Sequence, residues 1–284
     1  MLFDFSSGDF VFYDGAMGTM LQSRGLKAGM RPDIMNVTAP DVVESVHRMY
    51  VDAGSDIICT NTFGSNAMTL DGTGYSPDEI ITAAVTAAKR AASGRAKVAL
   101  DIGPVGYLLE PMGDLAPDAA YELFREQAII GERAGADLVA IETMSDLAEV
   151  RAAILAVTEN TSLPVFATMT FGKSGCTYIG CTPEDFAGLA NTLPVTAIGL
   201  NCSLEPSEMY ETAERLVKAT SLPIIVKPNA GLPDSQTGLY SLDPAGFAAQ
   251  MVRFAEIGVS VVGGCCGTTP DYIRELKRVF SALK

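Results

Sequence analysis

The sequence predicts a (β/α)8 barrel formed by a single domain that spans residues 1–284. Three observations support this fold class. Eight short apolar runs alternate with amphipathic segments along the whole chain, and no linker or block of charge interrupts them. The runs are nearly continuous in apolar residues, as parallel strands buried on both faces are. The length of 284 residues suits eight such units in a closed barrel better than an open doubly wound sheet.

The expected elements follow in a regular order. The predicted strands lie at residues 10–15, 56–63, 97–104, 136–143, 164–171, 197–203, 223–230 and 259–266. Predicted helices between and after them include residues 40–54, 77–93, 145–160, 205–221 and 269–283. Many of these helical segments open with Ser, Thr, Asp or Pro, which are the residues preferred at helix starts.

Charge and composition exclude several classes of partner. The net charge of −14 opposes binding to nucleic acid or to an anionic membrane. The first residues lack the basic flank and apolar core of a signal peptide, and no apolar run approaches the roughly 20 residues that span a bilayer. We therefore expect a cytoplasmic protein. In that reducing compartment its six cysteines do not form a disulfide framework.

Polar residues stand where the predicted strands end. In a barrel of this type the chemistry lies at the carboxyl ends of the strands. The residues at these ends are Asp14, Asn61, Thr62, Asp101, Glu142, Cys202, Asn229, Cys265 and Cys266. The only histidine, His47, lies inside a predicted helix and is assigned no ligand role.

Three of these residues are thiols that one barrel mouth brings together. Cys202 follows the sixth strand, and Cys265 and Cys266 follow the eighth. Only the seventh strand lies between them, and neighbouring strands are spaced about 4.8 Å apart. Three thiolates with an open fourth position are typical of catalytic zinc. Gly263, Gly264 and Gly267 allow the tight turn that presents both adjacent sulfurs.

Other interpretations of the cysteines remain open. Burial as small apolar residues is the commonest fate of a cysteine, and a vicinal disulfide is disfavoured in the cytosol. We assign the structural interpretation to Cys59, Cys176 and Cys181. Cys176 and Cys181 lie in the loop after the fifth strand, so an auxiliary role at the rim is their alternative.

The thiolate ligands favour one kind of chemistry. Zinc held by three thiolates carries net negative charge and is a poor generator of hydroxide. It suits the activation of a substrate thiol, because coordination replaces the thiol proton at neutral pH. Alkyl transfer to sulfur follows as the hypothesis.

The residues that support this hypothesis also carry a family resemblance. The motifs "DGAMGTML", "GSDIICTNTFGSN", "GADLVAIETMSDLAEV", "GLNCS", "KPNAGLP" and "GGCCGTTPDYI" cover nearly the whole chain. Together they resemble the zinc-dependent homocysteine S-methyltransferases, and most of all the homocysteine-binding barrel of cobalamin-dependent methionine synthases. The pairing of "GGCCGT" with an upstream "NCS" is the most specific part of the match.

The resemblance implies roles for individual residues. Cys202, Cys265 and Cys266 would bind Zn²⁺, and Asn229 would fill the fourth position until the substrate thiolate displaces it. Asp14 and Glu142 would meet the amino group of homocysteine, and Asn61 would lie at the mouth beside them. Backbone amides of the turn at Gly15, Ala16, Gly18 and Thr19 would bind the carboxylate. Methylcobalamin, free or on a separate corrinoid protein, is the expected donor.

Two rival functions remain. In the first, the chain is the first methyltransferase of a corrinoid-dependent demethylation system, and it transfers a methyl group from a methylated substrate to a corrinoid protein. Alternatively, it would be a non-catalytic barrel that binds zinc or senses homocysteine. The sequence leaves the methyl donor and the oligomeric state open.

Overall fold

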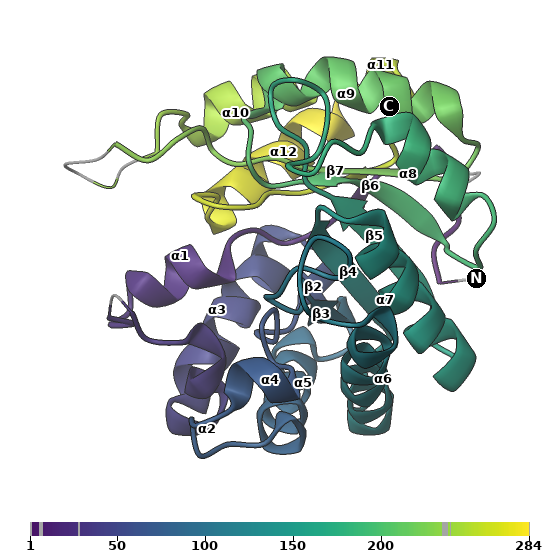
Figure 1. Ribbon diagram of the computed structural model, residues 1–284. Coiled ribbons are helices and arrows are strands. Elements are labelled where there is room, and N and C mark those ends of the chain that lie inside the picture. Colours follow the sequence, from purple (N-terminus) through teal and green to yellow (C-terminus); the bar gives the residue numbers. More distant parts are fainter. Residues whose placement is uncertain (1, 6–7, 28, 235–237, 239, 284) are drawn as a thin grey trace.

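Eight parallel strands form the central sheet of the computed structural model, which describes residues 2–5, 8–27, 29–234, 238 and 240–283. The strand order is β1-β8-β7-β6-β5-β4-β3-β2, and a parallel bridge between Tyr13 and Ile57 brings β1 to β2. This closes the ring and confirms the predicted (β/α)8 barrel (Figure 1). The strands are β1 Val11–Phe12, β2 Ile57–Cys59, β3 Lys97–Ile102, β4 Leu138–Met144, β5 Val165–Met169, β6 Ala197–Asn201, β7 Ile224–Lys227 and β8 Val261–Val262.

Helices surround this sheet, and the longer ones connect successive strands along the chain or follow the last strand, as the sequence predicts. They are α1 Met17–Gln22, α2 Met35–Thr38, α3 Pro40–Ala53, α4 Ala67–Leu70, α5 Pro77–Ala92, α6 Pro117–Ala134, α7 Leu147–Asn160, α8 Pro183–Ala190, α9 Pro206–Ala219, α10 Pro244–Met251, α11 Arg253–Glu256 and α12 Pro270–Ser281. The five predicted helices correspond to α3, α5, α7, α9 and α12. None of the helices formed by the described residues combines the length and apolar character that crossing a bilayer requires.

Local sequence explains where the helices begin. Pro77 occupies the first turn of α5, and the side chains of Ser76 and Glu79 form a capping box with each other's backbone N–H groups. α8 begins in the same way at Thr182 and Asp185. These caps satisfy amides that have no intrahelical partner. The loops at the carboxyl ends of the strands therefore lead into well-defined helices.

The interior of the barrel is a separate apolar cluster to which every strand contributes. Its members include Tyr13, Ala99, Phe166 and Ile225. Phe3 and Phe5 pack against this cluster, with ring centroids 6.3 Å and 6.2 Å from that of Phe166. Phe166 lies at the start of β5, so these rings cover the amino-terminal end of the barrel. The carboxyl end is left for polar residues.

Gly199 lies where the barrel interior has no room for a side chain. A Cβ atom at this position of β6 would lie 1.9 Å from the carbonyl oxygen of Ile225 on β7. We expect Gly199→Ala to lower the free energy of unfolding by about 1–3 kcal/mol, because the backbone must shift. Gly188→Ala is the matched control, since a Cβ there meets no atom within 4 Å and alanine favours helix α8. Equal effects in urea denaturation would contradict this account of Gly199.

Candidate active site

Three cysteine sulfurs lie together at the carboxyl end of the barrel. Cys202 directly follows β6, and Cys265 and Cys266 follow β8. Their Sγ atoms all lie within 4.8 Å of one another, and those of Cys202 and Cys266 are 3.9 Å apart. Four ligands around zinc at about 2.3 Å stand about 3.8 Å from each other. The donor set and its spacing therefore fit one tetrahedral zinc ion with three sulfur ligands.

The backbone around the cysteines is held in an unusual conformation. Cys202 and Ser203 have φ values of +62° and +59°, which residues other than glycine rarely adopt. Hydrogen bonds fix the other loop: the Cys265 N–H donates to the carbonyl of Pro228 at 2.8 Å, and the Cys266 carbonyl accepts from Ala230 at 2.9 Å. Strained residues that the surrounding structure holds in place are typical of functional sites.

Glycines next to the cysteine pair have two different functions. Gly267 has a φ of +81°, which confirms the expected tight turn. Gly263 and Gly264 are needed for close contacts instead, because a Cβ would lie 2.6 Å from that of Tyr13 and 2.2 Å from the Thr268 hydroxyl, respectively. The loop thus packs directly against Tyr13 after β1 and against its own Thr268.

The thiols change each other's pKa values. Hydrogen bonds from Cys265 and Cys266 stabilise the thiolate of Cys202 and lower its pKa. That negative charge raises the pKa values of Cys265 and Cys266 in turn. The free trio therefore favours a single thiolate, whereas a divalent cation would stabilise three.

Asn229 lies beside the sulfurs, as its place after β7 predicts. Its Oδ1 accepts a hydrogen bond of 3.0 Å from the backbone N–H of Cys266. The amide thereby orients the second cysteine of the pair. A carbonyl oxygen has a second lone pair, so this bond is compatible with the expected ligand role.

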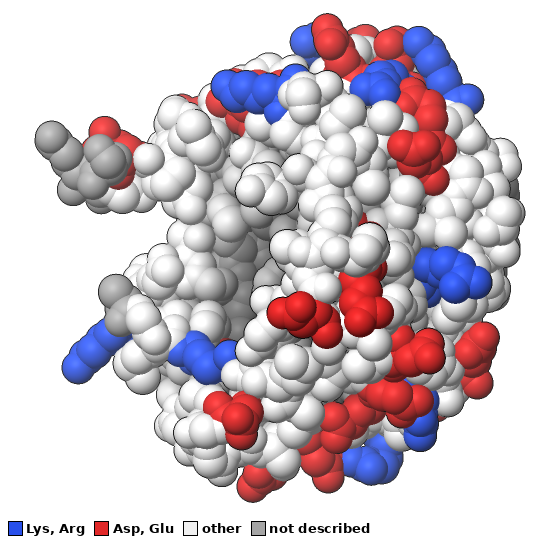
Figure 2. Space-filling view, viewed as in Figure 1, with Lys and Arg blue, Asp and Glu red and all other residues white. Residues whose placement is uncertain are grey.

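A cavity of about 660 Å³ opens from the cysteines toward the barrel mouth. Ten of the eleven predicted site residues line this cavity, and Asn229 is the exception. Thr62 and Asp101 line it as well. Figure 2 shows a deep hollow between the part of the chain that carries α10 and the part that carries α1. Charged side chains gather on the outer surface in this view, while the edges of the hollow are mostly uncharged.

Acidic residues and one lysine form the floor of this cavity. Asp101, Glu142 and Lys227 each stand two residues beyond a member of the interior cluster, namely Ala99, Ala140 and Ile225. Side chains alternate along a strand, so all three point into the barrel. Lys227 Nζ donates to Glu142 Oε2 and lies 4.4 Å from the ring centroid of Tyr13.

Lys227 is the principal residue that the sequence prediction missed. It is 4% exposed, and its ammonium group also lies 3.9 Å from the Sγ of Cys59. A lysine at the end of an apolar strand buried on both faces is out of place, and this was the signal available in "PIIVK". Glu142 is therefore already paired with a cation through one of its two oxygens.

Asp14 is buried at the end of β1, with an exposure of 2%. Its Oδ2 accepts a 2.8 Å hydrogen bond from the backbone N–H of Cys59. Burial raises the pKa of Asp14 to about 7, Lys227 opposes that rise, and the charge of Glu142 adds to it. An approaching cation would favour the charged form of this carboxyl group.

The backbone amides of the turn between β1 and α1 differ in whether the protein itself already binds them. The Ala16 N–H donates to the carbonyl of Thr268 at 3.1 Å, so the protein itself occupies this amide. Gly18 and Thr19 lie in the first turn of α1, before the first helical bond from Met20 to Ala16. Such amides have no intrahelical acceptor and face the end of the helix that attracts anions.

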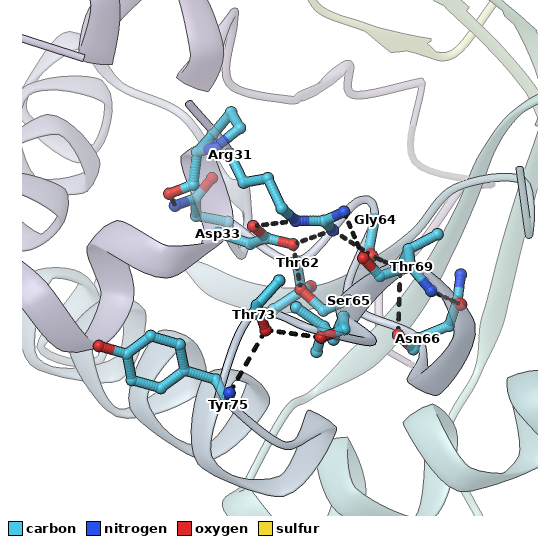
Figure 3. A network of polar contacts seen from close by, with 12 residues as sticks. Arg31, Asp33, Thr62, Gly64, Ser65, Asn66, Thr69, Thr73 and Tyr75 are labelled. Atoms are coloured by element: carbon cyan, nitrogen blue, oxygen red, sulfur yellow. Dashed lines mark hydrogen bonds and ion pairs between the residues drawn. The ribbon is translucent and has the colours of Figure 1, made fainter. Parts of the chain in front are cut away.

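One wall of the cavity is built by residues 31–36, which are clamped to the loop after β2. Arg31 forms a bidentate ion pair with Asp33, at 2.7 Å and 3.1 Å, and donates to the carbonyls of Gly64 and Thr69 (Figure 3). Asn61 donates to the carbonyl of Pro32 and to Asn36. Both N–H groups of the Asn61 amide are thus used in building the wall, which the sequence did not predict.

Asn201 holds the rim of the cavity at the end of β6. Its side chain bonds the backbone N–H of Thr143 at 2.9 Å and the hydroxyls of Thr143 and Thr168 at 2.8 Å. Thr143 has a φ of +63°, at the point where β4 shifts register. A bulge of this kind interrupts the regular alternation of side chains beyond it.

The remaining cysteines and the histidine lie away from the three sulfurs. Cys176 and Cys181 are half-buried in the loop after β5, and Cys181 packs against the core. Cys59 is buried at the end of β2, where it lines the cavity beside Asp14 and Lys227. His47 is fully buried within α3. None of these four residues belongs to the group of three sulfurs, and the structural interpretation of the three cysteines stays a prediction.

The closed sheet and the cysteine-lined cavity at its carboxyl end are those of an α/β-barrel enzyme. The sequence model of the homocysteine S-methyltransferase family matches residues 11–280, and the chain belongs to this family. It is 36% identical over 287 residues to a methionine synthase of Mycobacterium leprae and 35% identical over 307 residues to one of Mycobacterium tuberculosis. These alignments cover 93% and 100% of the chain, but only 24% and 26% of the two relatives.

A solved structure has the same fold. The metallated form of the homocysteine methyltransferase MmuM from Escherichia coli superposes with a TM-score of 0.82. The match covers 95% of this chain and 96% of that one, at 24% sequence identity. The likeness confirms the barrel.

Proposed function

We propose that residues 1–284 form a homocysteine-binding domain that methylates L-homocysteine to methionine. The observation that carries this proposal is the group of three sulfurs within 4.8 Å of one another, which open into an acid-lined cavity. Family membership supports the reaction class. A corrinoid, free or on a separate protein or domain, is the proposed donor.

Zinc is the proposed cofactor, held by Cys202, Cys265 and Cys266 with Asn229 in the fourth position until substrate arrives. Bound there, zinc would replace the thiol proton of homocysteine and keep the sulfur nucleophilic. The new C–S bond forms as the donor's bond to the methyl carbon breaks, and the electron pair of that bond stays with the donor.

The chain's own residues would orient the substrate. Asp14 and Glu142 accept hydrogen bonds from the substrate ammonium group, since both carboxylates line the cavity. The amides of Gly18 and Thr19 bind its carboxylate. Lys227 holds Glu142 in place from below. Asp14 and Lys227 are buried, and burial strengthens their polar interactions relative to water.

The assay offers methyl donors separately to the zinc-loaded protein with L-homocysteine. Methylcobalamin, S-methylmethionine and betaine are the donors, and methionine is quantified by mass spectrometry. We expect methionine from methylcobalamin. Tight binding of L-homocysteine without methionine from any donor would contradict the proposal and favour a sensing role.

A further inference from the structure

Asp101 is held rigidly at the floor of the cavity. Its backbone N–H donates to the hydroxyl of Thr60 at 3.0 Å, and its carbonyl accepts from the hydroxyl of Thr62 at 2.7 Å. These two hydroxyls are themselves 2.6 Å apart. The pair of threonines fixes the end of β3, so the direction of the Asp101 side chain is set before any ligand binds.

The carboxylate of Asp101 has an oxygen without a partner. The residue is 7% exposed, and its buried Oδ1 accepts no hydrogen bond from any described residue. By contrast, Asp14 accepts the N–H of Cys59, and Glu142 is bonded to Lys227. Buried polar atoms are nearly always satisfied, so an orphaned oxygen on a carboxylate whose residue lines the cavity indicates a missing donor.

The cavity also carries an excess of negative charge, which agrees with a missing donor. Among the described residues that line it, the acids are Asp14, Asp33, Asp101 and Glu142, and the bases are Arg31 and Lys227. Arg31 is paired with Asp33, and Lys227 is paired with Glu142. Asp14 and Asp101 are left without a cation from these lining residues. The missing donor is therefore expected to carry positive charge.

An ammonium group matches both requirements. It presents three N–H donors, whereas the proposed function supplies two carboxylate acceptors, Asp14 and Glu142. Burial and the neighbouring charge of Glu142 raise the pKa of Asp101, and an incoming cation would reverse that rise. Its orphaned oxygen thus gains most from a positively charged ligand.

We propose that Asp101 is a further substrate-binding residue, which accepts the third hydrogen bond of the substrate's α-ammonium group. The residue would make the cavity selective for amino-acid thiols over thiols that lack the amino group. This inference rests on the proposed function, because homocysteine supplies the ammonium group.

Isothermal titration of the zinc-loaded protein with two ligands tests the inference. The ligands are L-homocysteine and 4-mercaptobutanoate, which has the same carbon chain, thiol and carboxylate but no amino group. We expect Asp101→Asn to weaken the binding of L-homocysteine about tenfold or more and to change the binding of 4-mercaptobutanoate less than twofold. Asp101→Ala should behave in the same way if the asparagine variant is poorly folded.

Glu149→Gln is the matched control. Glu149 is also a buried carboxylate, 4% exposed, but it accepts the backbone N–H of Val105 and lies outside the cavity. We expect it to change neither affinity. Equal weakening of both ligands by Asp101→Asn, or no weakening of either, would overturn the role of Asp101. Failure of the unaltered protein to bind L-homocysteine would instead overturn the proposed function itself.

Discussion

Cys265→Ser is expected to lose zinc and methyl transfer together. A serine hydroxyl is a far weaker zinc ligand than a thiolate, and only two sulfurs would remain in the cluster. The zinc content should fall from about one ion per chain to below a tenth, with methionine formation reduced at least a thousandfold. Metal analysis after gel filtration, together with the methylcobalamin assay, measures both quantities.

The chain supplies a matched control for this substitution. Cys176 is half-buried in the loop after β5 and lies outside the three-sulfur cluster. Cys176→Ser should therefore retain zinc and activity. Full zinc content in the Cys265→Ser protein would rule out the proposed ligand set, whereas zinc loss in both variants would point to a general loss of folding.

Lys227→Met is expected to have the largest effect on stability. The side chains of Lys227 and Glu142 are only 5% and 13% exposed, so methionine would leave Glu142 as an uncompensated buried charge. Breaking a buried ion pair from one side costs about 3–5 kcal/mol. We expect the free energy of unfolding, measured by urea denaturation at pH 7.5, to fall by about this amount.

The double variant Lys227→Met/Glu142→Gln separates charge from packing. Because it removes both charges, it should recover a large part of the lost stability. The exposed pair of Lys173 and Glu208, with side-chain exposures of 71% and 29%, is the matched control. Lys173→Met should cost less than about 1 kcal/mol. A Lys227→Met protein as stable as the Lys173→Met protein would show that the buried pair carries no such role.

Periodicity in the sequence is sufficient to predict the barrel. The strands are almost entirely buried, so their runs are mostly apolar. The long helices begin at a Pro or directly after an Asp, and a side chain of Ser76, Asp146 or Thr182 caps α5, α7 and α8 in the structure. The cysteines were predictable for a related reason. Parallel strands place residues from distant parts of the chain at one end, so "NCS" and "GGCC" had to meet.

The contacts between the elements were not predictable in the same way. The ion pair of Lys227 with Glu142 joins β7 to β4 across the barrel interior, and periodicity carries no information on such a pairing. The clamp of Arg31 depends on the carbonyl groups of Gly64 and Thr69, which any residue type supplies. Hydrogen bonds to backbone atoms leave no pattern of residue types to recognise.

The role of the glycine-rich turn was only partly predictable for the same reason. The sequence "GAMGT" indicates free backbone amides, but the bond from Ala16 to the carbonyl of Thr268 depends on how the last loop folds back on the first. Asp101 was predicted at the mouth, yet its orphaned oxygen becomes visible only when every neighbour is placed.

X-ray absorption spectroscopy at the zinc edge tests the central claim most directly, because it counts the sulfur atoms bound to the metal. For the zinc-loaded protein we predict three sulfur ligands at about 2.3 Å and one lighter ligand. Addition of L-homocysteine should raise the count to four sulfurs. A count that stays unchanged when homocysteine is bound would contradict the claim that the three cysteines hold a zinc ion for the substrate thiol.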